Sequence, residues 1–175
     1  VAQDGPSPQS GALAAALRFE RQTLSNRFLC EGAAIGDLDG DGDVDIVAGP
    51  WWYEGPEFET RHAIEAEKVF PRLQYSENFF AWIHDLDGDG RNDIFFVGFP
   101  GKEAWWMRNT GDPAQWEKHV VFDSVDNESP AFVDMTGDGY PELVCQNQDR
   151  LGYARADRSD PTKPWQFVSV STGAG

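Results

Sequence analysis

Carboxylate and glycine residues alternate in three short segments of this 175-residue chain. The segments are DLDGDGDVD at 37–45, DLDGDGRND at 85–93 and DMTGDGYPE at 134–142. Each has oxygen-bearing side chains at positions 1, 3, 5 and 9 and glycine at positions 4 and 6. This alternation suits a hard divalent cation that takes six or more oxygen ligands, and glycine lets the backbone turn tightly between them. Because several carboxylates in one short loop repel each other without a cation, the spacing predicts a calcium site in each segment.

The sequence around the three loops repeats with the same period, since the loops begin 48 and 49 residues apart, at 37, 85 and 134. A short apolar segment precedes each loop, and a β-branched or aromatic run follows it, as in GAAIG and DIVAG. Next come an aromatic segment, such as AWWMRN, and an alternating one, such as WEKHVVFDS. Four short strands in each repeat of about 48 residues are typical of a β-propeller blade. We therefore expect an all-β fold of four-stranded antiparallel blades, in which the loop joins the first two strands.

Other calcium motifs fit the loops poorly. An EF-hand loop needs a bidentate glutamate at position 12 and a helix after it, whereas position 12 is Ala48 in the first loop and Phe96 in the second. Both residues fall within predicted strands. Paired dockerin-type loops lie about half as far apart as these and lead into helices, so that interpretation fails as well.

Three blades are expected, at about 29–66, 78–124 and 128–171. Residues 16–24 resemble the fourth-strand segments and would belong to a further blade, while residues 1–15 read as a flexible leader. Three blades are fewer than the four to eight that close a ring. We expect the remaining blades of a larger parent ring to be partners of this segment, with a symmetric dimer of six blades as the alternative.

The loops and their flanks, IGDLDGDGDVDIVAG, IHDLDGDGRNDIFFVG and VDMTGDGYPELVC, resemble FG-GAP/VCBS repeats, the calcium-binding blades of integrin α-subunits and many secreted bacterial proteins. The resemblance extends over about residues 16–171 and implies about two to three Ca²⁺ ions, one in each blade loop. It implies side-chain ligands at positions 1, 3, 5 and 9 and a main-chain oxygen at position 7. In the first loop these are Asp37, Asp39, Asp41, Asp43 and Asp45; in the second, Asp85, Asp87, Asp89, Arg91 and Asp93; in the third, Asp134, Thr136, Asp138, Tyr140 and Glu142. Thr136 and Glu142 depart from the pattern, so the third site is expected to be the weakest.

Net charge limits the possible partners. The formal charge of −16 argues against nucleic acid, which requires a basic surface. The loops contain 12 of the 30 acidic residues, and three bound Ca²⁺ would leave a net charge of about −10.

No apolar run approaches the length of a membrane span. A small, polar leader and calcium loops fit a processed secretory signal and a secreted, extracellular or periplasmic location. Cys30 and Cys145 occupy different positions in their repeats, which favours two separate buried thiols over a disulfide.

Tryptophan pairs occur at 51–52 and 105–106, and flat aromatic faces can stack on carbohydrate. Neighbouring strand residues face opposite ways, so we expect one member of each pair to pack in the core and leave open a ligand contact by the other. His62 and His119 match Phe167 in the third repeat, which favours packing over acid–base chemistry. For His84, just before a loop, a hydrogen bond to a neighbouring loop is the simplest expectation.

Binding is the predicted role, with a protein or carbohydrate ligand. In propellers of this family ligands usually bind the face opposite the calcium loops, and here that face would include the connector 67–78 and the insert at 98–104. No nucleophile motif, HExxH or phosphate loop occurs in the sequence, so no catalytic residue is predicted. Two alternatives stay open. The segment could be the non-catalytic scaffold of a polysaccharide-degrading lyase or hydrolase whose active site lies outside it, or an interaction module beside other domains.

Overall fold

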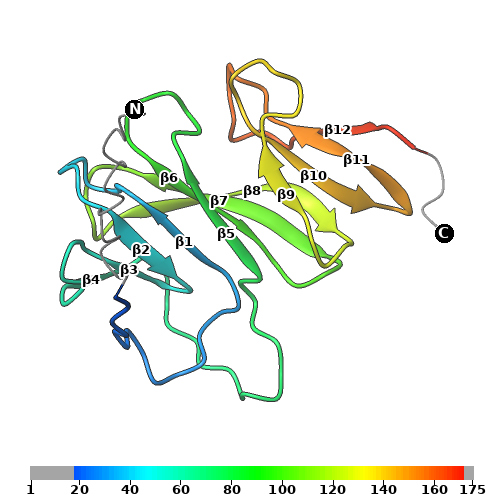
Figure 1. Ribbon diagram of the computed structural model, residues 1–175. Coiled ribbons are helices and arrows are strands. Elements are labelled where there is room, and N and C mark those ends of the chain that lie inside the picture. The colour runs from blue at the N-terminus through cyan, green and yellow to red at the C-terminus, as the bar shows by residue number, and fades with distance from the viewer. Residues whose placement is uncertain (1–17, 172–175) are drawn as a thin grey trace, which may run out of the picture.

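Three four-stranded sheets make up the computed structural model of the chain, which describes residues 18–171 (Figure 1). In each sheet the strands are antiparallel and consecutive strands are neighbours. The all-β prediction is therefore confirmed, and the sheets are those expected of propeller blades. Within residues 18–171 no helix is long and apolar enough to span a membrane. The predicted leader, residues 1–15, lies outside the described residues.

The sheets are named blades 1, 2 and 3 in chain order. Blade 1 contains β1 (Ala33–Gly36), β2 (Asp45–Ala48), β3 (Trp51–Tyr53) and β4 (Arg61–Ala63). Blade 2 contains β5 (Phe80–His84), β6 (Asp93–Val97), β7 (Lys102–Asn109) and β8 (Trp116–Val125). Blade 3 contains β9 (Ala131–Val133), β10 (Glu142–Asn147), β11 (Arg150–Arg155) and β12 (Gln166–Ser169).

The register of the first two strands is the same in all three blades. The last residue of the first strand pairs with position 9 of the loop, which begins the second strand, as in Gly36 with Asp45 and His84 with Asp93. Each acidic loop therefore closes a hairpin. In Figure 1 the β1–β2, β5–β6 and β9–β10 loops lie toward the upper and left edge, and the connector 67–78 lies at the bottom.

The apolar core lies between the blades, and the period of two along each strand explains which residues reach it. Trp52 and Trp105 belong to the cluster between blades 1 and 2, whereas Trp106 belongs to the cluster between blades 2 and 3. Both tryptophans of the second pair are thus core residues, because blade 2 is covered on both faces. In the first pair Trp52 is buried as predicted, while Trp51 is partly buried and donates Nε1–H to Glu67 at 2.9 Å.

Histidine side chains of the fourth strands pack against these tryptophans. His62 stacks on Trp52 with ring centroids 4.4 Å apart, and His119 lies 5.0 Å from Trp106. This confirms their predicted packing role. His84 differs from expectation, since in the described part of the chain it makes no side-chain hydrogen bond and instead meets the Tyr140 ring edge-on at 5.3 Å.

Apolar side chains are exposed on the faces of blades 1 and 3 that point away from blade 2. Ile35 on β1 is 72% exposed and Leu151 on β11 is 41% exposed. Such faces fit a ring with more blades, which stays a prediction, as does the assignment of residues 16–24 to another blade. Residues 18–30 form no strand.

The two cysteines are free thiols, as predicted. Cys145 is buried and Cys30 is partly buried. Desolvation is the largest cause that raises their pKa values, to about 12 for Cys145 and about 11 for Cys30.

Replacing Trp106 should test the core between blades 2 and 3. Its side chain is fully buried, so Trp106→Ala should lower the free energy of unfolding by about 3–5 kcal/mol. Denaturant unfolding would measure this loss. Trp51→Ala is the matched control, and because that side chain is only partly buried, its loss should be clearly smaller. Equal losses would contradict the assignment of Trp106 to the core.

Candidate metal centres

The residue at position 1 organises each acidic loop. In the first loop the Asp37 carboxylate accepts N–H hydrogen bonds from Gly40 at 2.7 Å and Gly42 at 3.1 Å. Both glycines have positive φ, 80° and 94°, a conformation that other residues rarely adopt. Asp85 and Asp134 make the equivalent contacts, with Gly88 and Gly90, and with Gly137 and Gly139. In the third loop these hydrogen bonds hold the pKa of Asp134 below its usual value, and the bond from Gly139 is the largest cause.

The residue at position 9 braces the loop against the sheet. Asp45 is 1% exposed, and its two oxygens accept the N–H groups of Leu38 at 2.7 Å and Gly55 at 2.9 Å. In blade 2 Asp93 likewise accepts from Leu86 at 2.9 Å and Asn109 at 2.8 Å. Burial raises the pKa of Asp93 to about 7. The sequence predicted these carboxylates only as ion ligands. The structure shows that they also join the start of the loop to the chain just after the third strand in blade 1 and to the last residue of the third strand in blade 2.

The third loop has a different brace. Glu142 accepts the N–H groups of Met135 at 2.9 Å and Thr136 at 3.2 Å, and its other oxygen accepts the Thr136 hydroxyl at 2.8 Å. No hydrogen bond from β11 to Glu142 occurs within residues 18–171. Met135 is 49% exposed, while Leu38 and Leu86 at the same position are buried. The third loop is therefore less firmly attached to its blade than the other two.

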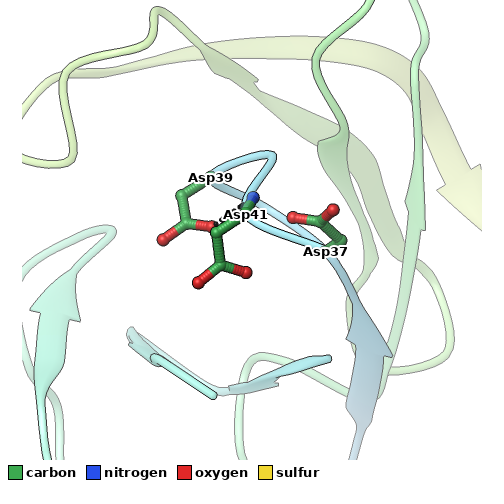
Figure 2. Close-up of side chains that lie close together, drawn as sticks. All are labelled: Asp37, Asp39 and Asp41. Carbon is green, nitrogen blue, oxygen red and sulfur yellow. Dashed lines mark hydrogen bonds between the residues drawn. The ribbon is translucent and has the colours of Figure 1, made fainter. Parts of the chain in front are cut away.

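Three carboxylates converge in each loop. Asp37, Asp39 and Asp41 form the first group (Figure 2), Asp85, Asp87 and Asp93 the second, and Asp134, Asp138 and Glu142 the third. Within each group the candidate ligand oxygens lie within 4.8 Å of one another. Such groups of hard oxygen donors fit Ca²⁺ by their chemistry. Of the other predicted side-chain ligands in the first two loops, Asp45 and Asp89 lie outside the groups.

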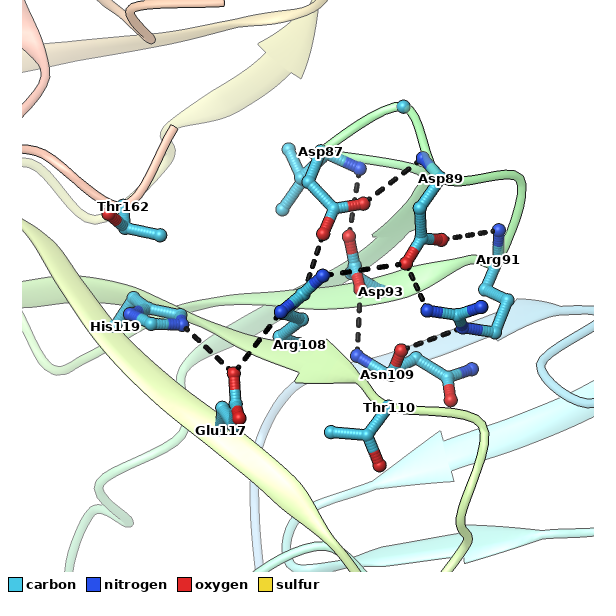
Figure 3. Close-up of polar contacts among 12 residues, drawn as sticks. Asp87, Asp89, Arg91, Asp93, Arg108, Asn109, Thr110, Glu117, His119 and Thr162 are labelled. Carbon is cyan, nitrogen blue, oxygen red and sulfur yellow. Dashed lines mark hydrogen bonds and ion pairs between the residues drawn. The ribbon is translucent and has the colours of Figure 1, made fainter. Parts of the chain in front are cut away.

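Arginine side chains contact the second and third loops. Arg108 on β7 donates Nε–H to Asp87 at 2.7 Å and lies 3.8 Å from Asp89, which also pairs with Arg91 (Figure 3). The Asp87 hydrogen bond is the main cause that raises the pKa of Arg108. Arg158 pairs with Asp138 in the third loop. Sequence reasoning gave these arginines no role as cations because nothing in the spacing shows which loop they would reach.

Side chains from each following blade hold the previous loop. Asn92 in the second loop donates to the carbonyl of Asp37 at 2.8 Å, and Asn109 donates to the carbonyl of Leu38 at 2.7 Å. The Tyr140 hydroxyl in the third loop donates in the same way to the carbonyl of Leu86. The three loops thus form a hydrogen-bonded series, which the sequence did not predict.

A pocket of about 360 Å³ lies between blades 1 and 2, on the side away from the acidic loops. The connector 67–78 and the insert 98–104 contribute to its wall, at the face where ligand binding was predicted. Its lining residues are Leu29, Pro50, Glu65, Ala66, Lys68, Phe70, Glu77, Asn78, Gly98, Phe99, Lys102, Glu103, Trp105 and Lys118.

Lysine residues gather at this pocket. The chain has four lysines, and three of them line it: Lys68, Lys102 and Lys118. Lys68 pairs with Glu77, and Lys118 lies 3.8 Å from Glu103 and 4.2 Å from the centre of the Trp105 ring. Lys102 has no carboxylate partner within residues 18–171. The pocket therefore offers an ammonium group beside aromatic rings and acceptor oxygens.

Comparison with known proteins identifies the repeat. The family model described as FG-GAP-like repeat matches residues 85–145, from the second acidic loop through β6, β7, β8 and β9 into β10. No curated protein matches the chain. The matched segment contains two of the three loops, and blade 1 has the same strand order and register. The resemblance seen in the sequence is thus confirmed: residues 85–145 match the FG-GAP-like repeat model and lie within three four-stranded sheets of the kind that form β-propeller blades.

Proposed function

We propose that this segment is a calcium-stabilised binding module that acts outside the cytosol. The observation that carries the proposal is the convergence of three carboxylates in each of three equivalent loops, on the side of the blades away from a mixed polar and aromatic pocket. FG-GAP repeats are generally non-catalytic modules, in agreement with the sequence, which predicts no catalytic residue. The loops would stabilise the fold and the pocket would bind the ligand.

When bound, Ca²⁺ would supply positive charge to three neighbouring carboxylates that otherwise repel each other. The side chains at positions 1, 3 and 5 are the proposed ligands in the first loop, namely Asp37, Asp39 and Asp41. Because Asp37 also holds the glycine N–H groups and Asp45 holds the hairpin, the chain itself fixes the loop in a shape that suits an ion. Sites of moderate affinity of this kind are filled where calcium is millimolar, which supports an extracellular or periplasmic location.

A carbohydrate or protein ligand would use the pocket between blades 1 and 2. Phe70 and Phe99 provide apolar surface, while Glu65, Asn78 and Lys102 provide acceptors and donors for a polar ligand. Next to the pocket, the exposed Tyr75 ring lies 5.0 Å from Phe99, so the aromatic surface continues along the connector. Sugars commonly bind to aromatic faces bordered by charged and amide groups, because the ring faces stack and the hydroxyls hydrogen-bond.

Calcium removal should test the structural role of the loops. A calcium concentration 100 times the dissociation constant of a loop adds about 2.7 kcal/mol to the free energy of unfolding. Excess chelator should therefore lower the melting temperature by about 5–10 °C for each loop that calcium nearly saturates. Asp39→Ala should reduce the number of bound ions by one, counted by isothermal titration calorimetry. Asp123→Ala, an exposed aspartate on β8, is the control and should leave the count unchanged. An identical melting curve with and without chelator would refute structural calcium.

The pocket proposal can be tested with a glycan microarray and the purified segment. Any glycan that binds should lose affinity for Lys102→Ala by about tenfold, the effect of one lost charged hydrogen bond. Lys163→Ala removes the one lysine outside the pocket and should leave binding unchanged, which controls for the change in net charge. Equal effects of the two substitutions would show that the pocket is not the binding site. Binding to a protein on a separate protein microarray that depends on Lys102 in the same way would favour a protein ligand.

A further inference from the structure

Arg108 occupies a position at which the three blades differ. The N–H groups of Gly55 and Asn109 both bond to a position-9 carboxylate, so the residues just before them, Glu54 and Arg108, are equivalent. In blade 3 the register places Arg155 at this position, because Ala154 pairs with Leu143 as Met107 pairs with Ile94. The equivalent residues are thus glutamate, arginine and arginine.

Only one of the two arginines reaches an acidic loop. Arg108 contacts Asp87 and Asp89, as described above, and its side chain is 38% exposed. Arg155 bonds to Gln166 at 3.4 Å, and position 3 of its own loop is Thr136, which has no charge to attract it. The contact of Arg108 therefore depends on the presence of an aspartate at position 3.

The first loop shows the arrangement without such a cation. Among residues 18–171 no lysine or arginine pairs with Asp37, Asp39 or Asp41, and these three carboxylates converge (Figure 2). In the second loop Asp89, equivalent to Asp41, pairs with Arg91 and Arg108 and lies outside the converging group (Figure 3). The guanidinium groups are thus bound to carboxylates that the first loop leaves free for an ion.

We propose that Arg108 is a built-in counter-cation of the second loop, which stabilises this loop without calcium and lowers its calcium affinity relative to the first loop. The inference rests on the proposed function, in which the loops bind calcium. It implies that two loops with nearly the same sequence bind calcium with different affinities.

The sign of the effect follows from charge. An ion bound to Asp87 would lie close to the guanidinium group, and the two positive charges repel each other. The Nε–H bond to Asp87 must also weaken when that carboxylate turns to the ion. Glu117 lies 3.5 Å from Arg108 on the far side from the loop and provides a second partner when the ion enters. Without calcium, the same contacts reduce repulsion among the loop carboxylates.

The experiment compares calcium affinity at the second loop with and without Arg108. Asp39→Ala and Asp138→Ala together silence the other two loops, and isothermal titration with Ca²⁺ then reports on the second loop alone. Adding Arg108→Gln should tighten binding by about tenfold. Arg155→Gln makes the same charge change at the equivalent position and should leave the affinity unchanged. Unchanged or weaker binding with Arg108→Gln would overturn the inference.

A second measurement keeps the test valid if the silenced variant fails to fold. In the otherwise unaltered chain, Arg108→Gln should lower the melting temperature in excess chelator and enlarge its increase on adding calcium, whereas Arg155→Gln should do neither. Conversely, Glu54→Arg should weaken calcium binding at the first loop. An unaltered chain that binds no calcium would overturn both the proposed function and this inference. Calcium binding by the unaltered chain with no effect of Arg108→Gln would overturn the inference alone.

Discussion

The rest of the structure depends on a buried carboxylate that accepts two backbone N–H groups. In blade 1 Asp45 connects the second residue of the loop with the chain just after β3, and in blade 2 Asp93 connects it with Asn109, the last residue of β7. A buried carboxylate without such partners would be costly. Because it has them, one side chain fixes the loop, the hairpin and the third strand together. The converging carboxylates of the loop are therefore held close to each other by a backbone that is fixed to the sheet.

Packing between blades depends on the same repeat. Strand alternation directs Trp105 toward blade 1 and Trp106 toward blade 3, so the central sheet contributes to both apolar clusters. The pocket lies at the blade 1–blade 2 junction, where Trp105 is also a lining residue. The core and the proposed ligand site therefore share the Trp105 side chain, so packing between blades 1 and 2 also fixes this part of the pocket wall.

Much of the fold was predictable from the sequence because its signals are local. The β-branched and aromatic runs DIVAG and DIFFVGF predict strands, and the glycines of the loops predict where the chain turns. The site was predictable in part. The convergence of Asp37, Asp39 and Asp41 follows from their spacing, but Arg108 lies 21 residues beyond Asp87 and reaches it only through the register of β6 and β7. The same holds for Asn92 and Tyr140, whose targets lie in another blade.

Hydrogen bonds between loops run in one direction along the chain. The carbonyl of Asp37 is held by Asn92, 55 residues later, and that of Leu86 by Tyr140, 54 residues later. A ribosome releases the earlier loop well before the residue that completes it. The first and second loops are therefore completed only after the following blade has emerged and docked, which gives these two loops an order of completion from the N-terminal side during synthesis.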